Sequence, residues 1–137
     1  MNIRVRTLAI NPCGCGFEGS IRMQLVDFGI EISCSYIGMN DEVISEAYKV
    51  GSITNAPVFL AFGAIKRTTK RTPSLSPMVV GQFVGWTMIE GDSYGVVDAL
   101  MPIPVDNELG DPILYFNPGD WVECSGELTL SHKNENG

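Results

Sequence analysis

The clearest structural signal in this sequence is a pair of neighbouring stretches, Ile21-Arg22-Met23-Gln24-Leu25 and Ile30-Glu31-Ile32-Ser33-Cys34-Ser35-Tyr36, with a break at Gly29 between them. In both stretches every second residue is apolar, which is the period of a strand that buries one face. The same alternation begins the chain, where Ile3 and Val5 are interleaved with arginines. These patterns predict a sheet that starts with three half-buried strands.

Most of the remaining chain also predicts strands, joined by turns rich in glycine and proline. Strands are expected at 57–65, 79–89, 94–101, 112–116 and 122–130, with a hairpin turn at 90–93 and loops at 66–78 and 102–111. One short helix is expected after Asn40, which would cap it, with Gly51 at its end. Its sheet-facing residues would be Val43, Ile44, Ala47 and Tyr48.

Many short strands with one short helix predict an all-β fold, a small antiparallel barrel. The stretch Pro118-Gly119-Asp120-Trp121-Val122-Glu123-Cys124-Ser125-Gly126-Glu127-Leu128 adds a second signal. It resembles the closing strand of OB-fold domains, in which a Gly-Asp turn leads into a hydrophobic strand interrupted by one glycine. A glycine there permits a bulge that bends the strand around a barrel. The resemblance implies an OB-like barrel and oligonucleotide binding, as in single-stranded DNA-binding proteins.

Size and composition predict one folded domain. The 137 residues, 45% of them hydrophobic, exclude a disordered chain and favour a single β-barrel domain over 1–131, with a disordered polar tail at 132–137. No apolar run reaches the roughly 20 residues of a membrane span, and the first residues do not resemble a signal peptide. We therefore expect a cytoplasmic protein without a membrane partner. Residues 58–65 are apolar on both faces, which predicts a central strand or the interface of a homo-oligomer.

Charge is unevenly distributed along the chain. The net charge is −7, but four of the nine basic residues fall between Lys66 and Arg71, while ten acidic residues lie between Glu90 and Glu135. A local cationic patch can still attract a polyanion, because salt screens distant charges over about 8 Å. Binding of single-stranded nucleic acid needs such a patch together with aromatic side chains on which bases stack. The candidate nucleic-acid-binding residues are Arg4, Arg6, Arg22, Lys66, Arg67, Lys70, Arg71, Trp86 and Trp121.

Two alternatives compete with this interpretation. The tryptophans can pack under loops while the basic side chains are simply solvated. The acidic half of the chain, with Glu90, Asp92, Glu123 and Glu127, can instead be a surface that binds a basic protein partner.

The cysteines allow a metal interpretation and a structural one. Cys13 and Cys15 form a C-x-C pair in a Pro/Gly turn, and with Cys34 and Cys124 they could make a tetrahedral zinc site. Cys34 and Cys124 also fall on the apolar faces of expected strands, so packing in the core is favoured over zinc. Activation of Cys13 or Cys15 as a nucleophile would need a nearby cation, and the sequence places none. The single histidine, His132, is in the polar tail. We therefore expect a non-enzymatic protein with no catalytic residue, cofactor or metal.

Overall fold

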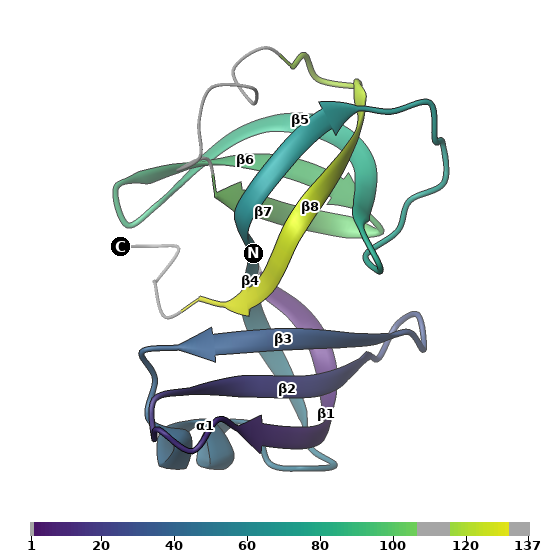
Figure 1. Ribbon diagram of the computed structural model, residues 1–137. Coiled ribbons are helices and arrows are strands. Elements are labelled where there is room, and N and C mark those ends of the chain that lie inside the picture. The colour runs from purple at the N-terminus through teal and green to yellow at the C-terminus, as the bar shows by residue number, and fades with distance from the viewer. Residues whose placement is uncertain (1, 107–115, 132–137) are drawn as a thin grey trace. The chain divides into compact units, whose positions relative to one another are not determined.

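A computed structural model describes residues 2–106 and 116–131 of the chain. Of the expected strand at 112–116, residues 112–115 lie outside this part, as does the expected tail at 132–137, and Phe116 is not in a strand. The described residues confirm the all-β class with one short helix (Figure 1). The elements are β1 (Asn2–Pro12), β2 (Glu18–Leu25), β3 (Glu31–Ile37), α1 (Asp41–Ala47), β4 (Ile53–Arg67), β5 (Val79–Ile89), β6 (Asp92–Ala99), β7 (Met101–Asp106) and β8 (Trp121–Leu130).

The strand pairing closes on itself, as in a β-barrel. The strand order is β1-β2-β3-β8-β4-β7-β6-β5, with additional β1–β4 and β8–β5 pairs, so each of these strands has neighbours on both sides. The pairs form two closed rings of five strands, β1-β2-β3-β8-β4 and β8-β4-β7-β6-β5, which share β4 and β8. Closure satisfies the backbone hydrogen-bonding groups that an edge strand would expose.

The pairing is mixed rather than purely antiparallel, which corrects one part of the predicted fold. Ser35 of β3 pairs with Thr129 of β8 in parallel, and Leu60 of β4 pairs with Val105 of β7 in parallel. Strand directions cannot alternate around a ring with an odd number of members. Each five-stranded ring therefore contains at least one parallel pair, and the local alternation in the sequence cannot reveal it.

The described chain divides into two compact units, each of which contains one ring. We call residues 2–58 and 128–131 unit A, and residues 59–106 and 116–127 unit B. Because β4 and β8 contribute to both units, this division does not decide whether the chain folds as one domain. The single domain over 1–131 therefore stays a prediction.

Unit A contains the three strands predicted most clearly from the sequence, with α1 near one end of them (Figure 1). Asn40 caps the helix, since its side chain accepts a hydrogen bond from the Glu42 backbone N–H at 2.8 Å. Ile44 and Tyr48 are buried as expected, but Val43, which is 61% exposed, and Ala47 both face solvent. The helix ends at Ala47, before Gly51. The core of unit A comprises Ile3, Val5, Ile21, Met23, Leu25, Ile32, Cys34, Tyr36, Ile44, Tyr48, Ala56, Val58, Leu128 and Leu130.

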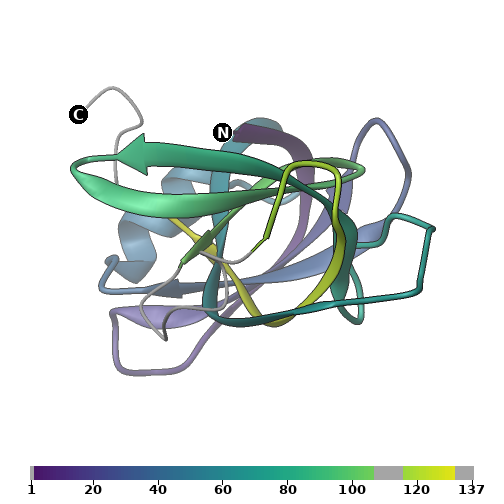
Figure 2. The same ribbon diagram turned by 90° about the horizontal axis from the view of Figure 1, so that it is seen from above.

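Unit B is built on the long hairpin of β5 and β6 (Figure 2). Its turn is Glu90-Gly91, and both residues have positive φ, as a two-residue hairpin turn requires. Residues 101–106 form strand β7 and not the predicted loop. Pro102 and Pro104 stand at alternate positions, so both missing N–H groups fall on one edge of the strand while the ladder to β6 stays complete.

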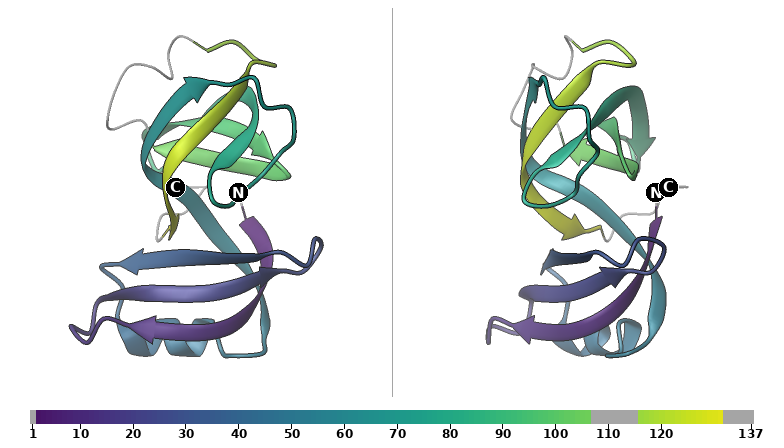
Figure 3. Two further views of the ribbon diagram at one scale, coloured as in Figure 1. Left: turned by 45° about the vertical axis from the view of Figure 1, so that its right-hand side comes forward. Right: turned by 90° about the vertical axis from the view of Figure 1, so that its right-hand side faces the viewer.

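The basic segment, residues 66–71, begins with the last two residues of β4 and continues into the loop that follows. In this part of unit B, β8 runs alongside the first residues of β5 (Figure 3). Lys66 and Arg67 are the last residues of β4, so the strand is longer than the predicted 57–65. Residues 68–78 form the expected loop, which is tied back by Ser74 and Val80, each donating a backbone hydrogen bond to the other. The core of unit B comprises Leu60, Ala61, Ile65, Leu75, Val79, Val80, Phe83, Ile89, Tyr94, Val96, Val97, Ala99, Ile103, Val105, Val122 and Cys124.

Candidate nucleic-acid interface

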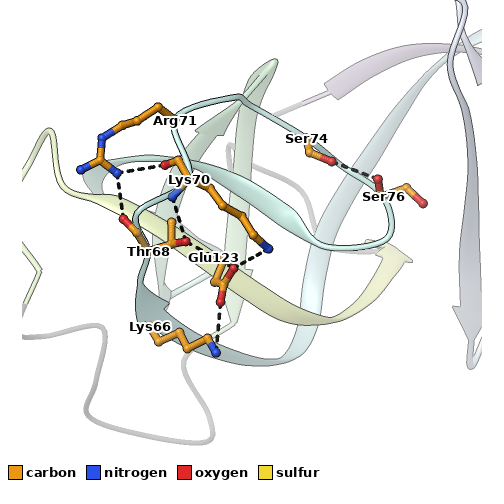
Figure 4. A network of polar contacts seen from close by, with 7 residues as sticks. All are labelled: Lys66, Thr68, Lys70, Arg71, Ser74, Ser76 and Glu123. Carbon is orange, nitrogen blue, oxygen red and sulfur yellow. Dashed lines mark hydrogen bonds and ion pairs between the residues drawn. The ribbon is translucent and has the colours of Figure 1, made fainter.

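Two of the four predicted basic residues of unit B converge on one carboxylate, Glu123 of β8 (Figure 4). Lys66 Nζ lies 3.0 Å from Glu123 Oε1, and Lys70 Nζ lies 2.8 Å from Glu123 Oε2. The Thr68 hydroxyl also donates to Oε2, at 3.4 Å. The hydrogen bonds from Lys70 and then Lys66 lower the pKa of Glu123 from 4.5 to about 2, so this carboxyl is ionised at neutral pH.

The alternation of Glu123 with the apolar residues Val122 and Cys124 predicts an exposed side chain, and this prediction is wrong. Its side chain is only 10% exposed, whereas the side chains of Lys66 and Lys70 are 71% and 57% exposed. The lysines therefore cover the carboxylate while their outer surfaces face solvent. The sequence signal for this contact is weak, because the lysines and Glu123 are more than fifty positions apart.

Arg67 lies at the end of β4 between a carboxylate and an aromatic ring. Its Nη2 is 3.5 Å from Asp120 Oδ2, and its guanidinium carbon is 5.1 Å from the centre of the Phe116 ring. The same Asp120 oxygen accepts a hydrogen bond from the Asn117 backbone N–H at 2.9 Å, which fixes the turn before β8. A guanidinium at this distance from an aromatic face is held by cation–π attraction.

Arg71 is positioned by the loop itself and points away from Glu123 (Figure 4). Its Nη1 donates to the carbonyl oxygens of Thr68 and Lys70 at 2.8 and 3.0 Å, and its guanidinium carbon is 5.7 Å from the centre of the Trp121 ring. Beside it is an open pocket of about 350 Å³ lined by Lys70, Arg71, Thr72, Ser74, Pro77, Met78 and Val80. Arg71, Trp121 and this pocket thus form one continuous surface of unit B.

Trp86 of β5 is 41% exposed, as predicted, and flanked by the exposed apolar residues Val84 and Met88. Its ring contacts buried Phe83 edge-on, with centroids 6.0 Å apart. Phe83 also contacts Phe116, the ring beside Arg67, with centroids 6.1 Å apart. An aromatic chain, Trp86–Phe83–Phe116, therefore connects the second predicted tryptophan to the cations.

The three other predicted basic residues lie in unit A, on exposed positions of β1 and β2. Arg4 is 3.7 Å from Asp27, and Arg22 is 3.6 Å from Glu31, with all four side chains more than half exposed. Such exposed pairs are weak. Arg6 occupies the position opposite Gln24 in the β1–β2 register. The structure therefore brings together Lys66, Arg67, Lys70, Arg71 and Trp121 in unit B, whereas Arg4, Arg6 and Arg22 belong to unit A.

The cysteines divide into two buried and two exposed thiols. Cys34 and Cys124 are fully buried, and burial raises the pKa of each thiol to about 12, which confirms their packing in the core. Cys13 and Cys15 are exposed in the loop between β1 and β2. Within the described residues, no group of three or more His, Cys, Asp or Glu side chains is arranged to hold a metal ion. The four cysteines therefore do not converge on one zinc site.

Comparisons with known proteins give no relative from which a function could be transferred. No family model matches the chain, and searches of curated proteins and of solved structures find no match. Among the described helices, none has the length and apolar character needed to cross a membrane.

Proposed function

We propose that this protein is a non-catalytic binding protein for single-stranded nucleic acid, and that the strand binds unit B along Lys66, Arg67, Lys70, Arg71 and Trp121. The observation that carries the proposal is the clustering of four cations, one of which, Arg71, lies over the Trp121 indole ring. Cationic grooves lined by aromatic rings bind single strands without strong sequence preference. A closed five-stranded barrel is also the architecture of OB-fold proteins, which supports the same class of ligand.

The local charge of this cluster remains positive despite the net charge of the chain. Four cations face two carboxylates, Glu123 and Asp120, which leaves a formal charge of +4 − 2 = +2. Glu123 is covered, so a phosphate approaching from solvent meets the lysine ammonium groups first. Arg71 has its guanidinium held by carbonyl oxygens and needs little reordering to bind a phosphate.

Titration of the protein with oligothymidine, monitored by intrinsic tryptophan fluorescence, tests the proposal directly, since both tryptophans of the sequence are in unit B. We expect binding that weakens with salt, with a log–log slope of about −0.7 for each phosphate contact. The double variant Arg67→Gln/Arg71→Gln should weaken binding and flatten this slope. Trp121→Leu should weaken binding by about 1–3 kcal/mol without changing the slope.

The matched control is Arg4→Gln/Arg22→Gln, which removes the same charge from exposed positions of unit A. It should leave both affinity and slope close to those of the wild type. If it weakens binding as much as the unit B variant, the proposed surface is wrong and binding follows net charge. Absence of binding at low salt contradicts the proposal altogether.

The alternative, an acidic surface for a basic protein partner, has less support. Of its four carboxylates, Glu123 is already bound to two lysines and covered by them. The remaining three, Glu90, Asp92 and Glu127, are exposed. Oligomerisation likewise stays a prediction; residues 58–65 lie in β4, which has neighbours on both sides.

A further inference from the structure

The loop between β1 and β2 holds two exposed thiols in a fixed turn. At its base the Cys13 backbone N–H donates to the Glu18 carbonyl at 2.9 Å. Farther along, the Gly16 carbonyl accepts from the Asp41 N–H at 2.9 Å and the Phe17 carbonyl from the Gly38 N–H at 2.8 Å. Three backbone hydrogen bonds in a short loop restrict the positions of the residues between them, so the two thiols are held in a defined arrangement.

Glycines on both sides of Cys15 turn the chain back toward Cys13. Gly14 has φ +96° and Gly16 has φ +94°, values that L-residues with side chains rarely adopt. In this conformation the Cys15 backbone N–H donates to the Cys13 sulfur at 3.3 Å. The two side chains are thus near each other across a single residue, and both are exposed to solvent.

The two thiols are also electronically different. A side-chain hydrogen bond between them lowers the pKa of Cys15 and raises that of Cys13, and a hydrogen bond from the Phe17 backbone lowers the pKa of Cys15 further. The lower pKa of Cys15 therefore comes from neighbouring hydrogen bonds and not from a nearby cation. The nearby charge of Glu18 acts in the opposite direction, raising both pKa values.

We infer that Cys13 and Cys15 form a redox-active dithiol that undergoes thiol–disulfide exchange with small accessible disulfides, with Cys15 as the attacking thiol and Cys13 as the resolving thiol. The Cys15 thiolate attacks one sulfur of a disulfide R–S–S–R, which forms a mixed disulfide and releases one RS⁻. Cys13, losing its proton, then attacks the Cys15 sulfur, which closes the Cys13–Cys15 bond and releases the second RS⁻. The protein gives up two electrons and two protons, and the substrate becomes two RSH.

The inference is independent of nucleic-acid binding, because the loop belongs to unit A and the proposed interface to unit B. Exposed disulfides in small rings are labile and readily reduced again. The dithiol would therefore cycle with the surrounding thiol pool rather than act as a permanent crosslink. The buried thiols Cys34 and Cys124 provide an internal reference, since burial keeps them protonated and inaccessible.

The test is to expose the fully reduced chain to hydroxyethyl disulfide, an uncharged probe, and to map the products by alkylation and peptide mass. We expect an intramolecular Cys13–Cys15 disulfide, with Cys34 and Cys124 unreacted. Cys13→Ser should stop at a mixed disulfide on Cys15. Cys15→Ser should react about tenfold more slowly, at Cys13, because the thiol with the larger thiolate fraction is lost.

Charge and geometry can be tested separately. Glutathione disulfide, which is anionic, should react more slowly than the neutral probe, and Glu18→Gln should reduce this difference. Gly14→Ala should accumulate the mixed disulfide, because alanine resists the positive φ of the turn. Gly29→Ala is the matched control, since Gly29 also has positive φ with open space around it but lies in the β2–β3 turn.

Several results would overturn the inference. One is a wild-type product that carries probe on both Cys13 and Cys15 without ring closure. Another is equal reaction rates for Cys13→Ser and Cys15→Ser. The third is ring closure in Gly14→Ala as fast as in the wild type.

Discussion

Unit A and unit B have the same number of paired strands but differ in the reactive and charged side chains that they expose. Each is a closed ring of five strands with one parallel pair and an apolar interior. Unit A holds both exposed thiols, and unit B holds both tryptophans and the four-cation cluster. In both units the reactive or charged side chains lie mainly in loops or at strand ends. A closed ring satisfies the backbone, which leaves the loops free to differ.

The largest expected losses of stability are at one close-packed glycine in each unit. A Cβ on Gly81 would stand 2.6 Å from the Asp98 carbonyl carbon in unit B, and a Cβ on Gly19 would stand 2.6 Å from the Asn11 carbonyl oxygen in unit A. A Cβ on Gly19 would also meet the Tyr36 hydroxyl, but at both positions backbone atoms of the adjacent strand stand in the way, so a side-chain movement alone cannot accommodate alanine. We expect Gly81→Ala and Gly19→Ala each to cost about 3 kcal/mol of unfolding free energy or more.

These variants also show whether the units unfold together. Tryptophan fluorescence reports on unit B alone, while circular dichroism reports on the whole chain. Since β4 and β8 contribute to both units, we expect Gly19→Ala also to lower the midpoint of the unfolding transition that tryptophan fluorescence reports. A fluorescence midpoint that is unchanged in Gly19→Ala would mean that the units unfold separately, against the predicted single domain.

The buried thiols allow a matched comparison of the two cores. Cys34→Ser in unit A and Cys124→Ser in unit B each place a hydroxyl where a fully buried thiol lay. We expect a loss of about 1–3 kcal/mol in each, measured by urea unfolding. Cys13→Ser, at an exposed position, should change stability by less than about 0.5 kcal/mol. A stable Cys124→Ser variant would indicate that the core of unit B is less tightly packed than that of unit A.

The helix cap gives a smaller effect that belongs to unit A. Asn40→Ala removes the acceptor for the Glu42 N–H and should cost about 1 kcal/mol. Asn40→Asp, which keeps a side-chain oxygen at the cap, is the control and should retain most of the stability. Equal losses in the two variants would show that the side-chain hydrogen bond contributes little.

The last comparison concerns the pH dependence of the lysine–glutamate contact in unit B. The folded state lowers the Glu123 pKa from 4.5 to about 2, so its stabilising contribution is complete above pH 4.5 and is lost as the pH falls through 2. The stability advantage of wild type over Glu123→Gln should therefore shrink across this interval in thermal unfolding. Glu127→Gln, an exposed position on the same strand, controls for the change in net charge. An advantage that is constant with pH would contradict the lowered pKa.

Local patterns predicted the strands, and long-range contacts determined what those patterns could not. The alternation at Ile21–Leu25 correctly indicated β2, and Asn40 correctly indicated the start of α1. By contrast, Pro102 and Pro104 predicted a loop where β7 forms. Both missing N–H groups fall on the same edge of the strand, and the sequence does not show this. The parallel pairs and the second ring also depend on residues distant in the chain.

The candidate site was predictable as a set of residue types but not as an arrangement. Lys66, Arg67, Lys70 and Arg71 lie within six positions of one another, so the cluster could be predicted from the sequence. Its carboxylate partners are on β8, and the alternation around Val122 wrongly indicated that Glu123 faces solvent. The difference in pKa between Cys13 and Cys15 depends on hydrogen bonds within a turn, which composition alone does not define.

The shared strands β4 and β8 also bear on how such a chain can change in length. Within unit A the Ser131 N–H donates to the Pro57 carbonyl at 2.7 Å, so the chain leaves this unit and re-enters it at adjacent points. The described residues 59–106 and 116–127, which make up unit B, therefore lie between two neighbouring strand positions of unit A in the order of the chain. An insertion or deletion in a loop of unit B would leave the strand connectivity of the unit A ring unchanged.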